Sequence, residues 1–140
     1  MCNACRAEYE DPTSRRFHAQ PNACPVCGPR LSLKDACGSQ IPAYGADAIL
    51  QLAANLLRGG GIAAWKGLGG YQLACDARNE AAVAELRKRK HRSQKAFAVM
   101  VGDIATAELL CEMTEPERRL LNGPSKPIVL LQTRVAPKLA

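Results

Sequence analysis

Four cysteines near the N-terminus have the spacing of a metal site. They form two Cys-x2-Cys pairs separated by eighteen residues, and their members are Cys2, Cys5, Cys24 and Cys27. Each pair fits a tight turn whose amides stabilise thiolate charge, so four sulfurs can converge on one tetrahedral Zn²⁺. Such a closed site has no open coordination position. We therefore predict a structural zinc that stabilises a segment too short to fold by itself.

Other uses of these thiols are less compatible with the sequence. Two disulfides would suit a secreted protein, but the sequence shows no secretory signal, and a redox pair would need a preceding strand and a following helix. His18 could replace one thiol as a ligand, although beside residues 15–17 (Arg-Arg-Phe) we expect it to pack locally. Cys37, Cys75 and Cys111 are unpaired by spacing, and we expect Cys75 and Cys111 to be small buried apolar residues.

A second chemical feature is a run of cations over residues 86–95. It contains no acid and equals the net charge of +6, and its cations are Arg87, Lys88, Arg89, Lys90, Arg92 and Lys95. The run crosses the predicted end of a helix and enters a loop, where Lys90, Arg92 and Lys95 are free to converge on a phosphate or carboxylate. A solvated helix face remains the alternative interpretation, and RNA is one anion that would fit.

A glycine-rich loop follows Lys66. The segment 66–70 lacks the Lys-Ser/Thr ending of a Walker loop, and Gln72 stands where the dinucleotide fingerprint needs its third glycine. The loop is therefore interpreted as a turn between two strands that carries one exposed lysine.

The elements that position these residues follow from apolar period and capping signals. We expect helices over residues 48–58 with Asp47 as cap, from Asn79 to Lys90, from Asp103 or Thr106 onward, and over 118–121 after a Thr114/Glu117 capping box. We expect strands over residues 62–65, 71–75, 96–101 and 128–131, the first of them buried. Alternation of helices and short apolar runs indicates an α/β layer structure.

Length and composition indicate the general class of protein. The chain has 140 residues and 15.0 kDa, with 47% apolar and 23% charged residues, which is ordinary for a globular protein. No apolar run is long enough for a bilayer, and we expect a cytoplasmic protein without a membrane partner. The first forty residues lack apolar periodicity, so we divide the chain into an irregular cysteine module, 1–40, and an α/β module, 41–140.

Several strings together resemble the HypF family of hydrogenase maturation carbamoyltransferases. They are residues 2–5, 15–21, 24–30, 66–71 and 73–77. The resemblance covers nearly the whole chain and pairs the second zinc-finger unit of that family with the start of its YrdC-like nucleotide-binding domain. It implies a small four-cysteine zinc-finger module followed by a partial α/β domain, YrdC-like with a twisted mixed sheet.

The resemblance also implies an activity for a longer enzyme. In that family an acylphosphatase-like domain releases carbamate from carbamoyl phosphate, and the YrdC-like domain joins carbamate to ATP, with Mg²⁺, giving carbamoyl adenylate and pyrophosphate. A further domain passes the carbamoyl group to the C-terminal cysteine of HypE for the cyanide ligands of nickel-iron hydrogenase. Lys66, Lys90, Arg92 and Lys95 then resemble the pocket that holds nucleotide and carbamate. We expect the chain alone to be inactive, because the other domains are absent from it.

Two positions depart from the family pattern, since Gln72 stands in place of a histidine and Ala96 in place of a proline. Two alternatives stay open. A YrdC-type threonylcarbamoyl-adenylate synthase for tRNA modification is disfavoured by the fused zinc unit. A zinc-containing module that binds double-stranded RNA by shape is the other, since 4% aromatic residues offer little base stacking for single strands.

Overall fold

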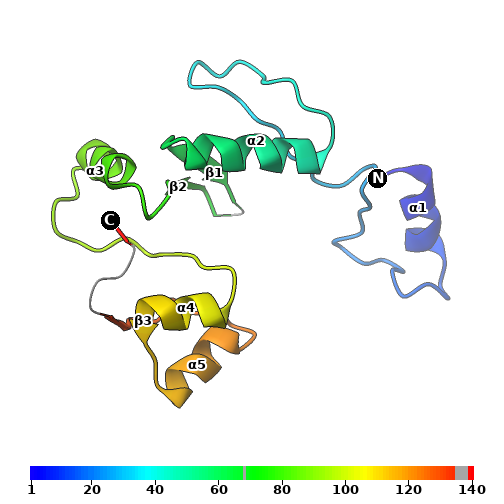
Figure 1. Ribbon diagram of the computed structural model, residues 1–140. Helices are drawn as coiled ribbons and strands as arrows, with labels where there is room; N and C mark the ends of the chain where they lie inside the picture. The colour runs from blue at the N-terminus through cyan, green and yellow to red at the C-terminus, as the bar shows by residue number, and fades with distance from the viewer. Residues whose placement is uncertain (68, 135–138) are drawn as a thin grey trace. The chain divides into compact units, whose positions relative to one another are not determined.

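The computed structural model describes residues 1–67, 69–134 and 139–140 (Figure 1). The chain forms two compact units, Met1–Ala54 and Asn55–Ala140. The division falls inside helix α2 (Ala46–Arg58). The module boundary predicted between residues 40 and 41 stays a prediction.

The first unit opens with α1 (Asn3–Glu10), where the sequence predicted irregular structure. Its eight residues include good helix formers, Ala, Arg and Glu, but Cys5 is its single buried side chain. A helix that buries one cysteine leaves no apolar period to detect, which explains the wrong prediction. Turns follow, and Lys34 and Gln40 form an isolated antiparallel bridge farther along the chain.

Helix α2 confirms the predicted amphipathic segment. Ile49 and Ala53, four residues apart on one face, are buried. The helix begins at Ala46, so Asp47 lies inside its first turn and does not cap it, contrary to the prediction. A carboxylate there still complements the positive end of the helix dipole. The helix ends in a Schellman turn, in which Gly60 has a φ of 83° and Gly61 donates its N–H to the Leu56 carbonyl at 2.9 Å.

The second unit contains the hairpin of β1 (Ala63–Lys66) and β2 (Tyr71–Ala74). The strands are antiparallel and Lys66 pairs with Tyr71. The turn is closed by a hydrogen bond of 2.8 Å from the Gly67 N–H to the Gly70 carbonyl, which confirms the interpretation of this loop as a strand connection. Leu68 lies outside the described residues. Residues of β1 alternate between half-buried and exposed, so the strand is not the buried one predicted.

Helix α3 (Glu80–Arg89) precedes the basic loop. The Asn79 side chain accepts a hydrogen bond from the Ala82 N–H at 3.0 Å, which confirms the predicted cap. Ala82, Val83 and Leu86 are buried and share one face. The helix therefore packs through a narrow apolar stripe and exposes its cationic C-terminal turn.

The remaining elements are α4 (Ile104–Leu110), β3 (Cys111–Glu112), α5 (Glu115–Asn122) and β4 (Gln132–Thr133). Asp103 caps α4 by accepting from the Thr106 N–H at 2.7 Å, which decides between the two starts considered. Glu117 accepts from the Thr114 N–H at 2.7 Å, as the predicted capping box requires. Strands β3 and β4 pair antiparallel.

Two predicted strands do not form. Residues 96–101 and 128–131 carry no strand assignment, and Met100, Ile128 and Leu130 are 95%, 82% and 92% exposed. Apolar runs make a strand only where a neighbouring strand satisfies their main-chain groups, and that partner is not encoded in the run itself.

The combination of helices and small sheets confirms the α/β class, with two antiparallel two-stranded sheets in the described part of the chain in place of the mixed sheet expected. Across the described ranges, no helix has both the length and the apolar character that crossing a bilayer demands.

Candidate functional site

Cys2 and Cys5 are positioned by the start of α1. Cys2 is the N-cap residue, with extended φ and ψ of −79° and 167°, and Cys5 lies one turn further on. Arg6 donates its N–H to the Cys2 carbonyl at 2.9 Å, which closes this first turn. Residues three apart lie on one face of a helix, so both thiols face the same side.

Cys24 and Cys27 lie on a tight turn. The Cys24 carbonyl accepts from the N–H groups of Cys27 and Gly28 at 3.2 and 2.7 Å. A Cβ on Gly28 would lie 2.8 Å from that carbonyl oxygen, closer than real Cβ atoms approach, so the turn requires glycine there. The tight turn predicted for this pair is confirmed, whereas the pair Cys2 and Cys5 lies on the first turn of a helix.

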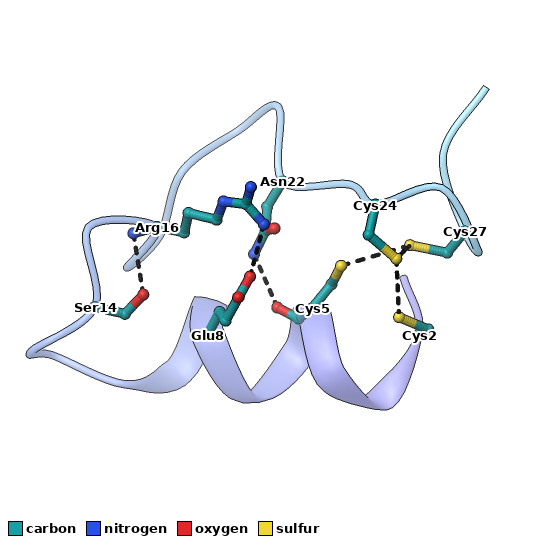
Figure 2. Close-up of polar contacts among 8 residues, drawn as sticks. All are labelled: Cys2, Cys5, Glu8, Ser14, Arg16, Asn22, Cys24 and Cys27. Carbon is teal, nitrogen blue, oxygen red and sulfur yellow. Dashed lines mark hydrogen bonds and ion pairs between the residues drawn. The ribbon is translucent and has the colours of Figure 1, made fainter.

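The four sulfurs converge as a zinc site requires. Sγ of Cys24 lies 3.6 Å from that of Cys2 and 3.9 Å from that of Cys27, and Sγ of Cys27 lies 3.7 Å from that of Cys5 (Figure 2). All four lie within 4.8 Å of one another. Tetrahedral Zn–S bonds of about 2.3 Å place sulfurs about 3.8 Å apart, whereas a disulfide needs about 2.05 Å. The geometry fits four thiolates around zinc and excludes disulfides between these pairs.

The protein environment acts differently on the two pairs. Main-chain hydrogen bonds from Cys24 and Cys2 lower the pKa of Cys27 to about 6, and those from Cys27 and Val26 lower the pKa of Cys24. Burial raises the pKa of Cys5 to about 12. The tight turn thus favours thiolates, while the buried Cys5 thiolate needs a nearby cation to offset its lost hydration.

Asn22 joins the two halves of this site. It is buried, and its Nδ2 donates to the Cys5 carbonyl at 2.8 Å, so the segment leading to Cys24 is tied to α1 (Figure 2). On the same unit, Arg16 pairs with Glu8 at 2.8 Å, but both side chains are substantially exposed. Sequence reasoning missed Asn22, because an asparagine before a Cys-x2-Cys turn carries no distinctive signal.

His18 lies apart from the sulfur cluster and packs locally, as expected. Its ring stacks on Tyr9 at a centroid distance of 4.9 Å and contacts Phe17 at 4.3 Å. The other three cysteines are free thiols. Cys75 and Cys111 are half-buried, which is less than predicted, and Cys37 is exposed.

In the second unit, Lys66 ends β1. Its Nζ lies 5.2 Å from the centre of the Tyr71 ring, across the hairpin. A depression of about 290 Å³ beside it is lined by Gly67, Gly69, Gly70, Tyr71 and Gln72. Gln72, one of the two departures from the family pattern, therefore lies at the glycine turn.

The other predicted cations lie together after α3. Lys90 is the C-cap residue of the helix, and the Lys90 and Lys95 side chains are exposed without a bonded partner in the described part of the chain. Arg92 is half-buried and donates to the carbonyls of Lys95 and Ala96 at 3.2 and 2.9 Å. Arg87, which sequence reasoning did not single out, contacts the same loop.

A four-thiolate site followed by a small α/β unit defines a two-module protein of the zinc-finger class. The HypF finger family matches residues 1–34. The chain belongs to the Sua5/YciO/YrdC family, described as telomere recombination, whose sequence model matches residues 55–140.

Known proteins contain both modules in this order. Carbamoyltransferase HypF of Rhodobacter capsulatus is 52% identical over 134 residues, which is 96% of this chain and 17% of that protein. The crystal structure of T. kodakarensis HypF matches with a TM-score of 0.82 and 45% identity over 99% of this chain and 18% of the other. A full-length HypF in its phosphate- and nucleotide-bound form matches with a TM-score of 0.77 and 41% identity, over 96% and 17% of the two chains.

The resemblance to HypF predicted from the sequence is therefore confirmed. The chain spans less than a fifth of the length of each of these relatives.

Proposed function

We propose that this chain is the zinc-finger and nucleotide-binding part of a HypF-type carbamoyltransferase. The enzyme would convert carbamoyl phosphate and ATP to carbamoyl adenylate and pass the carbamoyl group to the C-terminal cysteine of HypE, toward the cyanide ligands of nickel-iron hydrogenase. The observation that carries the proposal is the joint match of both modules, in order, at 52% identity to a named carbamoyltransferase over 96% of the chain.

The basic loop supplies chemistry that suits adenylate formation. A carbamate oxygen attacks the α-phosphorus of ATP, the bond from that phosphorus to the bridging oxygen of the β-phosphate breaks, and pyrophosphate leaves. Negative charge grows on the phosphate oxygens, and fixed cations lower that barrier while holding two anions together. We assign this role to Lys90, Arg92 and Lys95, with Lys66 at the glycine turn. Mg²⁺ would accompany the ATP.

The zinc finger serves the same enzyme structurally. All four ligand positions are thiolates, so no position is open for substrate. None of the seven cysteines forms a disulfide, which suits a reducing compartment. We therefore assign the protein to the cytoplasm.

A chimaera tests the proposed function. In R. capsulatus HypF the matching 134 residues are replaced by this chain, and ATP–pyrophosphate exchange is measured with carbamoyl phosphate. Exchange is expected, and Lys90→Ala with Lys95→Ala should reduce it by at least about 100-fold, since each charged contact contributes about 1.5–3 kcal/mol. Lys88→Ala, an exposed lysine of the same run, serves as the control and should stay within about twofold.

Two outcomes would contradict the proposal. Exchange that depends on threonine and bicarbonate in place of carbamoyl phosphate would identify a threonylcarbamoyl-adenylate synthase. Binding of a short RNA duplex by the 140-residue chain with steep salt dependence, and without ATP binding, would identify an RNA-binding module.

A further inference from the structure

Helix α3 ends in a turn that folds the basic run back on itself. His91 has a φ of 48° and donates its N–H to the Lys88 carbonyl at 3.1 Å, and the Arg92 N–H reaches the Arg87 carbonyl at 3.0 Å. These are the two hydrogen bonds of a Schellman motif, here with a histidine at the left-handed position that glycine usually takes. The motif brings residue 92 back against residue 87.

Two arginines contact the same aromatic ring. The guanidinium carbon of Arg87 lies 4.7 Å from the centre of the Phe97 ring, and that of Arg92 lies 5.2 Å from it. All three side chains are half-buried, whereas the residues between Arg92 and Phe97 are exposed. We call Arg87, Arg92 and Phe97 the arginine clamp. Each cation–π contact holds a long side chain in one place on the ring.

The clamp also holds the main chain of the loop. The Lys95 carbonyl accepts from Nη1 of Arg87 and from Nε of Arg92, both at 3.2 Å. Arg87 Nη1 also donates to the Arg92 carbonyl at 3.3 Å, and Arg92 Nη2 to the Ala96 carbonyl at 2.9 Å. Four hydrogen bonds thus fix residues 92–96, a stretch without regular secondary structure.

No acid neutralises this cluster within the described residues. Glu85, the acid on the neighbouring turn of α3, is paired with Arg89 at 2.6 Å. Two guanidinium groups share one carbonyl oxygen, and Lys90 and Lys95 extend from the same loop. Like charges held close without a counterion attract a multivalent anion, and a rigid loop loses little entropy when that anion binds.

We propose that Arg87 and Phe97 are positioning residues for polyphosphate binding, and that they hold Arg92, Lys90 and Lys95 in the arrangement that receives the anion. The inference rests on the proposed function for the identity of the anion. Arg92 has a double role, because Nε and Nη2 hold the loop, while Nη1, which has no hydrogen bond to any described residue, can bind the anion.

The test uses the 140-residue chain with two readouts, hydrogen exchange of the Arg92 amide, which donates to the Arg87 carbonyl, and calorimetric affinity for ATP and for inorganic pyrophosphate. Phe97→Leu removes the ring without changing charge, and Phe97→Tyr keeps the ring. Arg87→Gln removes the clamp cation, and Lys88→Gln removes an exposed cation one residue away. We expect Phe97→Leu and Arg87→Gln to accelerate exchange and weaken both ligands about tenfold, while Phe97→Tyr and Lys88→Gln stay within about twofold.

Each result has a defined meaning. Unchanged affinity in Phe97→Leu, or equal losses in Arg87→Gln and Lys88→Gln, would overturn the positioning role. If the unmodified chain binds neither ATP nor pyrophosphate, the positioning inference is overturned, whereas ATP–pyrophosphate exchange in the chimaera still decides the proposed function. Equal exchange of the Arg92 amide in the unmodified chain and Phe97→Leu would overturn the clamp itself. Hydrogen-exchange protection of the α3 amides shows whether each variant is folded. If Phe97→Leu unfolds α3, the comparison of Arg87→Gln with Lys88→Gln, which remove the same charge, decides the test.

Discussion

Both units bury an apolar helix face, but within the described residues only the first unit also contains a cluster of metal-ligating groups. In Met1–Ala54 the most deeply buried side chain is Cys5, 1% exposed, and it belongs to a sulfur cluster. Among the described residues of Asn55–Ala140, the buried groups are one apolar face of α3 and Ala107 of α4. Metal ligands impose fixed distances on the chain, whereas apolar packing depends on which segments meet. The comparison predicts that the two units respond separately to metal removal, hydrogen-bond loss and capping changes.

Removal of zinc should have the largest effect and should be confined to the first unit. With a chelator, or with Cys5→Ser, we expect amides of residues 3–28 to lose protection, because structural zinc contributes about 10–16 kcal/mol in zinc-finger peptides. Amides of α3 should keep theirs. Hydrogen exchange with elemental analysis measures both. Cys37→Ser, which changes an exposed thiol, should keep one zinc per chain.

The bond from Asn22 to Cys5 should have the next largest effect. Asn22→Asp replaces the donating amide by a carboxylate of equal size, and we expect zinc affinity to fall about 10–100-fold, as when partners of metal ligands are removed elsewhere. Competition with a zinc indicator measures this. Asn122→Asp, the same change on an exposed position of α5, should leave zinc affinity unaltered. Equal affinities for the two variants would show that Asn22 does not hold the site.

A capping change should disturb the second unit without touching the first. Asn79→Ala removes the acceptor for the Ala82 N–H and should reduce stability by about 1 kcal/mol, while Asn79→Asp keeps the acceptor and should reduce it less. The free energy of unfolding is measured in urea, with hydrogen-exchange protection of the α3 amides as the probe. The zinc content should stay at one per chain. Loss of zinc in Asn79→Ala would refute the independence of the units.

The smallest effect concerns pH. Hydrogen bonds from the side chain and main chain of Thr106 hold the pKa of Asp103 below its ordinary value of 3.8. The contribution of this cap is therefore complete above that value and is lost as pH falls through the lower folded-state pKa. The Thr106 amide resonance, followed by NMR, should titrate below about pH 4. Asp103→Asn, which keeps an acceptor but does not ionise, should remove that titration.

Spacing and capping signals predicted most of the local structure. The two Cys-x2-Cys pairs identify the sulfur cluster, and Asn79, Asp103 and Thr114 mark the starts of three helices. These features depend on residues within a few positions, so they can be read from the sequence.

Longer-range features were not predictable in this way. The apolar runs 96–101 and 128–131 form no strands, while the short strands β3 and β4 pair across about twenty residues. The arginine clamp depends on Phe97 returning to α3, ten residues after Arg87. A Schellman turn brings together residues five apart, here Arg87 and Arg92, and glycine usually marks such a turn in a sequence. This chain has His91 at that position, so the turn was not recognised.

The unequal construction of the two cysteine pairs has a consequence for how the finger assembles. The turn at Cys24 is closed by main-chain bonds between residues at most four apart, so it can exist before any ion arrives. The other pair needs α1, whose eight residues are fewer than the roughly 12–15 at which an isolated helix is even marginal in water. We therefore expect Cys24 and Cys27 to bind the incoming ion first, and the bound ion then to stabilise α1, which supplies the other two ligands.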